Sequence, residues 1–362
     1  MTLLMFAAGL IMLVVGAEAL VRGASKLARA VGLSPLIIGL TIVAFGTSAP
    51  EMAVSVLAGL AGNADISLGN VVGSNIFNVL LILGVSSVIT PLIVSTQLVR
   101  LDVPIMVAAS FLTWILGADG KIGHSDGILL FAGIILYTAF LVYQGRRESK
   151  EAPENKEPTS NDQKSFLEGK LLVNIGLIAA GLVLLVWGSN WLVRGAVSIA
   201  EYLGVSQLLI GLTVVAAGTS LPEVATSVVA AIHGERDIAV GNVVGSNIFN
   251  IMAVLGMSAI VAAKGITISD VALRFDIPIM TAVAVACLPI FFTGNVISRW
   301  EGGLFLGYYL AYTLYLILSA THNDMLPLFG RAMLWFVIPI TVITLLVVLV
   351  RPIRTRKKVQ ES

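Results

Sequence analysis

The sequence predicts an all-α integral membrane protein in which two five-helix repeats of inverted topology form a ten-helix core, followed by an eleventh C-terminal helix. Three observations predict this fold class. The 362 residues are 57% hydrophobic and only 12% charged, about half the charged share of a soluble domain. Apolar runs of about 20 residues, long enough to span a bilayer core, recur along the chain. Finally, a long segment of the first half recurs in the second half.

Eleven apolar segments are predicted to span the membrane. In chain order they cover residues 3–21, 36–60, 66–90, 103–118, 126–143, 171–192, 206–232, 238–263, 276–293, 303–319 and 332–350. We expect the first segment to remain as a helix rather than to be cleaved as a signal peptide. Its basic residues, Arg22, Lys26 and Arg29, follow the apolar run instead of preceding it.

The lysines and arginines set the predicted orientation. With the N-terminus outside, 17 of the 22 basic residues fall in the predicted inside segments, and the positive-inside rule favours that arrangement. The C-terminus, with the basic run RPIRTRKK at 351–358, is then cytoplasmic. We expect a multi-pass protein of the plasma (inner) membrane, because the linker is short and sorting signals are lacking.

Residues 144–170 separate the two halves. They carry twelve charges in 27 residues and almost no apolar side chains, which predicts a solvated, disordered cytoplasmic linker. The predicted organisation is therefore a first half over 1–143, this linker, a second half over 171–320, and an extra membrane helix with a basic cytoplasmic tail over 331–362.

The two halves are copies of one repeat. Residues 39–84 align with 211–256 without a gap, and 29 of the 46 positions are identical. The decamer GNVVGSNIFN occurs letter for letter at 69–78 and 241–250. Because each repeat holds five spans, an odd number, the copies must cross the membrane in opposite directions. Inverted repeats are typical of secondary transporters, whose substrate site lies between the repeats near the bilayer midplane.

Glu51 and Glu223 occupy matching positions in the middle of apolar spans. Each follows a Gly-Thr-Ser-X-Pro motif, whose proline and glycine are expected to break or bulge the helix and free backbone carbonyls. A charged side chain at that depth is costly and needs a partner. A protonated glutamate in a structural hydrogen bond is the alternative, but two glutamates at matching positions favour a functional pair.

The oxygens near these glutamates indicate a site for a hard cation. Freed carbonyls would come from residues such as Ala44 and Ala216. Hydroxyls and further carbonyls would come from the Thr-Ser pairs of the two motifs, Thr47 with Ser48 and Thr219 with Ser220. No Cys or His is nearby, so this oxygen-only set suits Ca²⁺, whose charge two glutamates balance.

Each decamer adds a polar stripe, because residues four apart share one face of a helix. The stripes consist of Asn70, Ser74 and Asn78 in the first repeat and of Asn242, Ser246 and Asn250 in the second. We expect them to face the glutamates and to supply neutral oxygens for Na⁺ or Ca²⁺. Asparagines that hold helices together are the alternative interpretation, and the two roles are compatible.

These motifs, GTSAPE or GTSLPE followed by GNVVGSNIFN, occur twice in opposite topology and resemble the repeats of the sodium/calcium exchanger family. The likeness covers residues 1 to about 320. It implies a ten-helix exchanger core that exchanges Na⁺ for Ca²⁺ by alternating access, with Glu51 and Glu223 as central Ca²⁺ ligands. It also implies that the overlapping Ca²⁺ and Na⁺ sites are completed by Thr47, Ser48, Thr219, Ser220, Ser74, Ser246, Asn78 and Asn250.

The chain departs from that family pattern at two places. Position 250 is Asn, where K⁺-dependent relatives and some prokaryotic relatives have Asp. Two carboxylates rather than three favour exchange without K⁺, and the Na⁺ stoichiometry stays open. The eleventh helix has no counterpart in the ten-helix core. A Ca²⁺/H⁺ antiporter that uses the same glutamates is the alternative function.

Other function classes are disfavoured. No nucleophile–base pair or His-based metal site occurs at membrane depth, so we expect no enzyme activity. A channel would need a continuous pore, which the broken helices of an inverted repeat do not favour. We expect no cofactor; the predicted partners are the transported Ca²⁺ and Na⁺ and the membrane lipid, with no nucleic acid and no protein partner implied.

Overall fold

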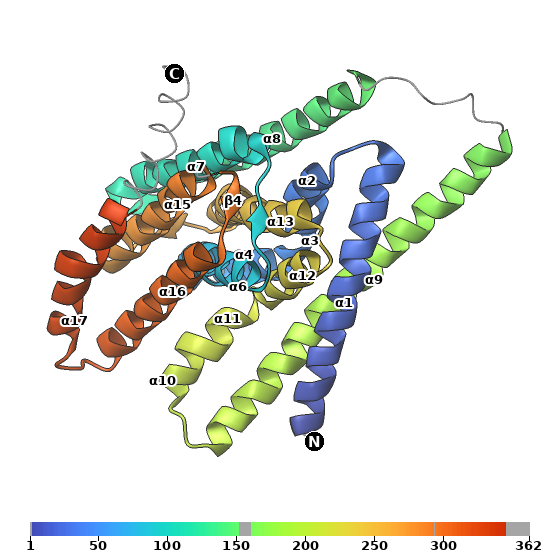
Figure 1. Cartoon of the computed structure of the whole chain (residues 1–362). Coiled ribbons are helices and arrows are strands. Elements are labelled where there is room, and N and C mark those ends of the chain that lie inside the picture. Colours follow the sequence, from blue (N-terminus) through green and yellow to red (C-terminus); the bar gives the residue numbers. More distant parts are fainter. Residues whose placement is uncertain (1, 152–160, 293, 345–362) are drawn as a thin grey trace, which may run out of the picture.

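The computed structural model describes residues 2–151, 161–292 and 294–344, and nearly all of them are helical (Figure 1). The first half contains α1 (Thr2–Val31), α2 (Pro35–Ile38), α3 (Ala44–Thr47), α4 (Ala49–Leu60), α5 (Ala64–Phe77), α6 (Gly84–Ile89), α7 (Val103–Leu116) and α8 (His124–Glu151). The second half contains α9 (Asn161–Tyr202), α10 (Gln207–Ile210), α11 (Ala216–Gly218), α12 (Leu221–Ile232), α13 (Arg236–Phe249), α14 (Gly256–Val261), α15 (Ile277–Phe292) and α16 (Arg299–Ala320). A last helix begins with α17 (Leu326–Ala332) and continues to Thr344.

Two short antiparallel strand pairs join loops of the two halves. They are β1 (Leu92–Ile93) with β4 (Val296–Ile297), and β2 (Lys121–Ile122) with β3 (Ile266–Thr267). Each pair therefore connects one repeat to the other outside the helices.

Each predicted membrane span overlaps a helical segment. Within the described part of the chain, nine helices are long and apolar enough to cross a membrane, and Pro35–Thr47 with Ala49–Leu60 forms a tenth span that is bent by 48°. The predicted span 206–232 is interrupted at the matching place, between α11 and α12. The prediction of an all-helical membrane fold is confirmed.

Helices α8 and α9 extend into the segment predicted as a disordered linker. Because α8 continues to Glu151 and α9 begins at Asn161, that prediction is wrong for residues 144–151 and 161–170. Both stretches are rich in Glu, Lys, Arg and Gln, which have high helix propensity, and extending an existing helix avoids the cost of nucleation. The rest of the predicted linker, 152–160, and the tail beyond 344 lie outside the described residues.

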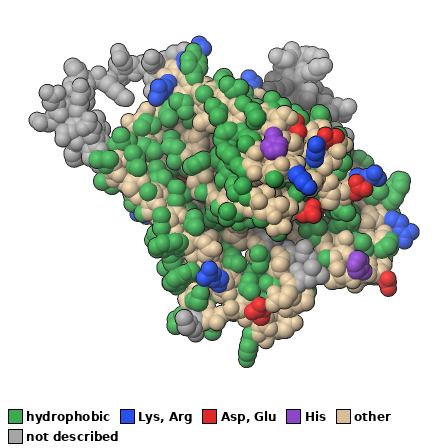
Figure 2. Space-filling model, turned by 180° about the vertical axis from the view of Figure 1, so that it is seen from behind, with side chains coloured by type: hydrophobic (Ala, Val, Ile, Leu, Met, Phe, Trp, Pro, Cys, Tyr) green, Lys and Arg blue, Asp and Glu red, His purple; other side chains and the backbone are tan. Residues whose placement is uncertain are grey.

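The helices that contain the decamers form the centre of the molecule. In Ala64–Ile89 and Arg236–Val261, 72% and 78% of the apolar window is buried, against 6% for α16 and 0% for Leu326–Thr344. The outer helices expose apolar side chains, and Figure 2 shows hydrophobic side chains over much of one face. Polar decamers inside and apolar helices outside are what a protein surrounded by lipid requires, because polar groups in the bilayer need partners within the protein.

Short π-helical turns occur at matching positions of the two halves. They cover Gly39–Val43 and Gly211–Val215, Asn78–Leu83 and Asn250–Leu255, and Leu98–Asp102 and Ala272–Asp276. Such turns are rare and are frequently found at functional sites. The first pair comes just before the Gly-Thr-Ser motifs and the second begins at the last Asn of each decamer, so both shape the backbone at the predicted cation site.

Helices α1 and α9 pack along each other through glycines (Figure 1). The glycines recur every seven residues, at Gly9, Gly16 and Gly23 in α1 and at Gly181, Gly188 and Gly195 in α9. A Cβ atom added at Gly16 would lie 2.9 Å from the carbonyl oxygen of Gly181, and one added at Gly188 would lie 2.9 Å from that of Gly9. Small residues let the two backbones touch, as they do in closely packed membrane helices.

A polar cluster joins α1 to the connection between α12 and α13. The imidazole Nδ1 of His233 lies 3.3 Å from the Glu18 carboxylate, and the Ser25 hydroxyl donates to Glu235 at 2.5 Å. Arg29 lies 3.6 Å from the same Glu235 carboxylate. The corresponding connection of the first repeat lacks this carboxylate. Its residue at the position of Glu235 is Asn63, which is exposed. The two ends of the molecule are therefore not equivalent.

Candidate cation site

The two helix breaks place Glu51 and Glu223 at the start of short helices. Both carboxylate side chains are 0% exposed. Glu51 lies in the first turn of α4, which begins after a kink at Ser48, and Glu223 lies in the first turn of α12, which begins after a kink at Ser220. The first turn carries unpaired N–H groups and the positive end of the helix dipole, which stabilise a carboxylate.

Each glutamate accepts a hydrogen bond from the kink serine of the other repeat. Ser220 donates to Glu51 Oε1 at 2.8 Å, and Ser48 donates to Glu223 Oε1 at 3.1 Å. Ser220 also lies 3.0 Å from the hydroxyl of Ser74 in the first decamer. The predicted glutamates and serines of the two motifs therefore meet in one place, between the repeats.

The threonines of the motifs bond the first asparagine of the opposite decamer. Thr47 donates to Asn242 Oδ1 at 3.0 Å, and Thr219 donates to Asn70 Oδ1 at 3.3 Å. The Thr47 hydroxyl also lies 3.1 Å from the carbonyl oxygen of Val43 and 3.4 Å from that of Ala44. The Ala44 carbonyl lies beside the break, but it accepts the backbone N–H of Ser48 at 3.0 Å, so the break does not free it as the sequence predicted.

Asn75 and Asn247, two asparagines outside the predicted site, orient two asparagines within it. Asn78 donates through Nδ2 to Asn247 Oδ1 at 3.0 Å, and Asn250 donates through Nδ2 to Asn75 Oδ1 at 3.2 Å. All four residues are buried. The predicted stripes do not include Asn75 and Asn247, because each lies one position beyond the serine of its stripe; the signal that could have found them is the identity of the whole decamer.

These bonds leave a set of buried oxygens without a hydrogen-bond donor. The set consists of Glu51 Oε2, Glu223 Oε2, Asn78 Oδ1, Asn250 Oδ1 and Ser246 Oγ. Because the amide nitrogens of Asn78 and Asn250 are used by the neighbouring asparagines, their oxygens are the free ends. A buried oxygen without a partner costs free energy comparable to a lost hydrogen bond, and a cation relieves that cost for several oxygens at once.

The chemistry of this oxygen set matches a hard cation. It contains two carboxylates, two amide oxygens and one hydroxyl, and Ca²⁺ prefers six to eight such ligands. The described residues contain no cluster of three or more His, Cys, Asp or Glu side chains, so the neutral oxygens are essential to any cation bound here. Burial in the protein strengthens the attraction between the cation and the two carboxylates.

The structure brings together eleven of the twelve residues predicted for the site. Ten of them take part in the hydrogen bonds described above or belong to the unpaired oxygen set, and Ala44 lies against Thr47. For Ala216, which begins α11, the surroundings of the side chain lie outside the described residues. The alternative role for the asparagines also receives support, because Asn75 and Asn247 link the two decamers.

Comparison with known proteins gives consistent similarities. The family model described as sodium/calcium exchanger protein matches residues 1–144 and 173–318. CaxA of Alkalimonas amylolytica is 38% identical over 289 residues, which are 77% of this chain and 87% of that protein. The sodium/calcium exchanger MaX1 of Methanosarcina acetivorans is 32% identical over 303 residues, 75% of this chain and 86% of that protein. The solved structure of a sodium/calcium exchanger from Methanococcus jannaschii has a TM-score of 0.73 at 30% identity and covers 85% of this chain and 96% of its own.

Proposed function

Since this chain belongs to the sodium/calcium exchanger family, it is a multi-pass membrane transporter of the cation/Ca²⁺ antiporter class rather than an enzyme, and we propose that it extrudes Ca²⁺ in exchange for Na⁺. The single observation that carries this proposal is that Glu51 and Glu223, each bonded to the kink serine of the other repeat, both keep one buried carboxylate oxygen without a donor. Asn78, Asn250 and Ser246 of the two decamers also hold unpaired buried oxygens. A proton-coupled carrier needs only the two acids, whereas amide and hydroxyl oxygens are ligands that suit Na⁺.

In this proposal Ca²⁺ and Na⁺ compete for one oxygen set. Glu51 and Glu223 balance the charge of one Ca²⁺, and the predicted hydroxyls, amides and carbonyls complete its coordination. Na⁺ ions use overlapping oxygens, so their binding displaces Ca²⁺. Residue 250 is Asn, and the site therefore holds two carboxylates rather than three, which supports exchange that does not need K⁺.

Alternating access would expose the site to one side of the membrane at a time. The central helices around the decamers act as the stationary part, and α1 with α9 is the part that moves across them. The positive-inside distribution supports an external N-terminus and a cytoplasmic C-terminus, which places the polar cluster of Glu18, His233 and Glu235 on the cytoplasmic side. The empty carrier would not readily switch its access from one side to the other, because two unpaired carboxylates would have to pass through a low-dielectric region.

The test is uptake of ⁴⁵Ca²⁺ into proteoliposomes that are preloaded with Na⁺, compared with K⁺-loaded vesicles and with vesicles under a proton gradient. We expect uptake to need internal Na⁺ and to ignore the proton gradient. Glu51→Gln should lower uptake by about a hundredfold, because it removes one of two buried charges that neutralise Ca²⁺. Glu201→Gln, at an exposed glutamate at the end of α9, is the matched control and should transport normally.

Each other result has a definite meaning. Uptake driven by the proton gradient in the absence of Na⁺ would establish the Ca²⁺/H⁺ alternative. Uptake that persists in Glu51→Gln would show that the cation site lies elsewhere.

A further inference from the structure

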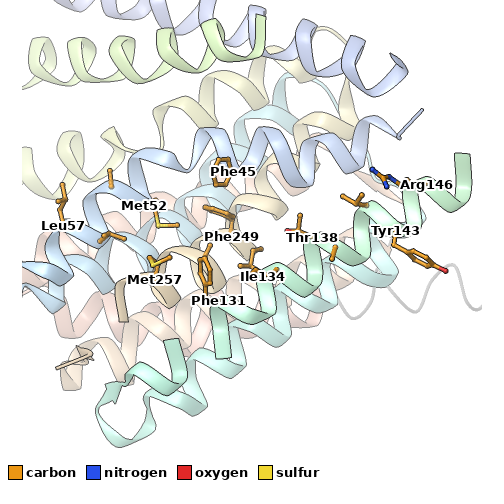
Figure 3. Close-up of a pocket in the computed structure, with 16 residues that line it drawn as sticks. Phe45, Met52, Leu57, Phe131, Ile134, Thr138, Tyr143, Arg146, Phe249 and Met257 are labelled. Atoms are coloured by element: carbon orange, nitrogen blue, oxygen red, sulfur yellow. The ribbon is translucent and has the colours of Figure 1, made fainter. Parts of the chain in front are cut away.

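A concave feature of the outer surface is lined by neither Glu51 nor Glu223. It is a groove of about 1200 Å³ between α3–α4, α8 and the segment that links α13 to α14. Figure 3 shows side chains from all three parts of the chain turned toward it. The walls consist almost entirely of hydrophobic groups, among them Phe45, Met52, Phe131, Ile134, Phe249 and Met257.

The floor of the groove is the outer surface of the helices that hold the cation site. Met52 follows Glu51 directly, and Phe249 precedes Asn250. Phe45 and Phe249 meet edge to face with ring centroids 5.2 Å apart, so the floor is a contact between the two repeats. Phe45 is nevertheless 60% exposed, which leaves apolar area for an occupant.

One end of the groove has a different character. Tyr143 and Arg146, on α8, are its lining residues at the end remote from Leu57 (Figure 3). Arg146 is exposed and forms no ion pair with any acidic side chain among the described residues. Along α8 the distance from Phe131 to Arg146 is about 22 Å, at 1.5 Å per residue, which is enough for an acyl chain in one leaflet of about 15 Å. Arg146 opens the charged run that follows the apolar part of α8, so this end of the groove is expected at the membrane interface, where Tyr and Arg are favoured.

We propose that this groove binds an anionic phospholipid, with its acyl chains along the apolar walls and its phosphate group at Arg146. The apolar walls suit a hydrocarbon chain. The Arg146 guanidinium, which has no acidic partner among the side chains that the structure describes, suits a phosphate, which it can bind through two parallel N–H donors. Tyr143 can contribute a hydroxyl at the same level. Because the chains contact the residues adjacent to Glu51 and Asn250, the bound lipid supports the outer surface of the cation site.

The proposal is tested by lipid binding to the purified full-length protein, measured by native mass spectrometry. Phosphatidylglycerol and phosphatidylcholine with identical acyl chains are compared. One basic residue near the membrane surface attracts an anionic headgroup enough for about fivefold tighter binding. We expect that preference in the wild type, its loss in Arg146→Gln and its retention in Arg146→Lys. The control Arg147→Gln removes a charge from the neighbouring residue, which does not line the groove, and should retain the preference.

A second pair of variants tests the position of the acyl chains. Ala139 lines the groove and is exposed on α8, whereas Ala132 is exposed on the same helix but does not line it. Ala139→Trp fills the groove and should lower the binding of both lipids, and Ala132→Trp should not. Ala53→Trp fills the groove from α4 and replaces Ala139→Trp if that variant does not fold.

The proposal fails under three results. Equal binding of the two lipids by the wild type would show that the charge of the headgroup does not contribute to binding. A preference that survives in Arg146→Gln would place the phosphate elsewhere, and undiminished binding in both groove-filling variants would place the acyl chains elsewhere. These measurements need no ion gradient, so their outcome is independent of whether Na⁺ or H⁺ is the counter-ion.

Discussion

At the scale of single residues, the most consequential feature is the way Asn75 and Asn247 determine which end of an amide faces the cation site. An asparagine presents an oxygen or an NH₂ group in nearly the same volume, and only its partners fix the choice. Here each NH₂ group of Asn78 and Asn250 is used by an asparagine of the other repeat. Asn75 and Asn247 are therefore positioning residues, and the amide oxygens that they leave free are the proposed ligands.

Asn247→Ala tests this positioning role. The change removes the acceptor of the Asn78 amide, so the Asn78 side chain is free to rotate and its oxygen is no longer held toward the site. We expect the half-saturating Ca²⁺ concentration to rise about fivefold, the equivalent of one hydrogen bond, with little change in the maximal rate. Ca²⁺ uptake at varied Ca²⁺ measures both quantities.

The matched control is Asn295→Ala, an asparagine whose hydrogen bond to Thr96 is exposed. It should leave the half-saturating concentration unchanged. An unchanged value in Asn247→Ala as well would mean that Asn78 holds its orientation without this partner, or that its oxygen does not contact the ion.

The sequence predicts which residues lie together where a single position already stands out along the chain. Burying an ionisable side chain such as that of Glu51 in an apolar span costs free energy, which indicates a function. The same motif in both repeats strengthens that indication. The pairing of Asn75 with Asn250 could not be predicted, because it depends on which decamer faces which across the molecule. A single sequence fixes the spacing along one helix but not the rotation of two helices about each other.

At the scale of helices, the contact between α1 and α9 depends on glycine. Gly188 is one of six glycines that bring the two backbones together, whereas Gly176 on the same helix has open space beside it. The seven-residue spacing of the glycines can be read from the sequence. That the glycines of α1 lie against those of α9 cannot, because it depends on how the two repeats pack.

Gly188→Leu should disrupt this contact. A Cβ atom at that position would lie 2.8 Å from the backbone nitrogen of Leu13, so α1 and α9 must separate. We expect Ca²⁺ uptake to fall more than tenfold and the thermal midpoint to decrease, because van der Waals packing between membrane helices is lost. Gly176→Leu adds the same side chain to the same helix and should behave as the wild type. Normal uptake in both variants would show that close backbone contact is not required for transport.

At the scale of the whole molecule, the two ends differ although the repeats are nearly identical at the centre. A polar cluster joins α1 to the α12–α13 connection at one end, and the exposed Asn63 occupies the corresponding position at the other. This difference was not predictable from the repeat itself, since a duplicated sequence suggests two equivalent ends.

Glu235→Gln tests whether this cluster holds its end of the molecule closed. It removes the charge that Arg29 faces and weakens the acceptor of the Ser25 hydroxyl. Because the Arg29 side chain is 73% exposed, the effect is that of a screened surface pair, on the order of threefold. We expect half-saturating Ca²⁺ to fall on the proposed cytoplasmic face and to rise on the opposite face, measured in oriented proteoliposomes. A parallel change on both faces would contradict a role in holding one end closed.

The glycine contact between α1 and α9 also bears on how faithfully an antiporter converts one gradient into another. Each of these helices is the first of its repeat, and the repeats have opposite topology. Because their backbones are in contact, the two helices would move as one unit in the proposed alternating access, so a movement that opens the site to one side would close it to the other. Such coupling would prevent slippage, in which ions run downhill without moving their counterpart, and would add to the effect of the two buried carboxylates.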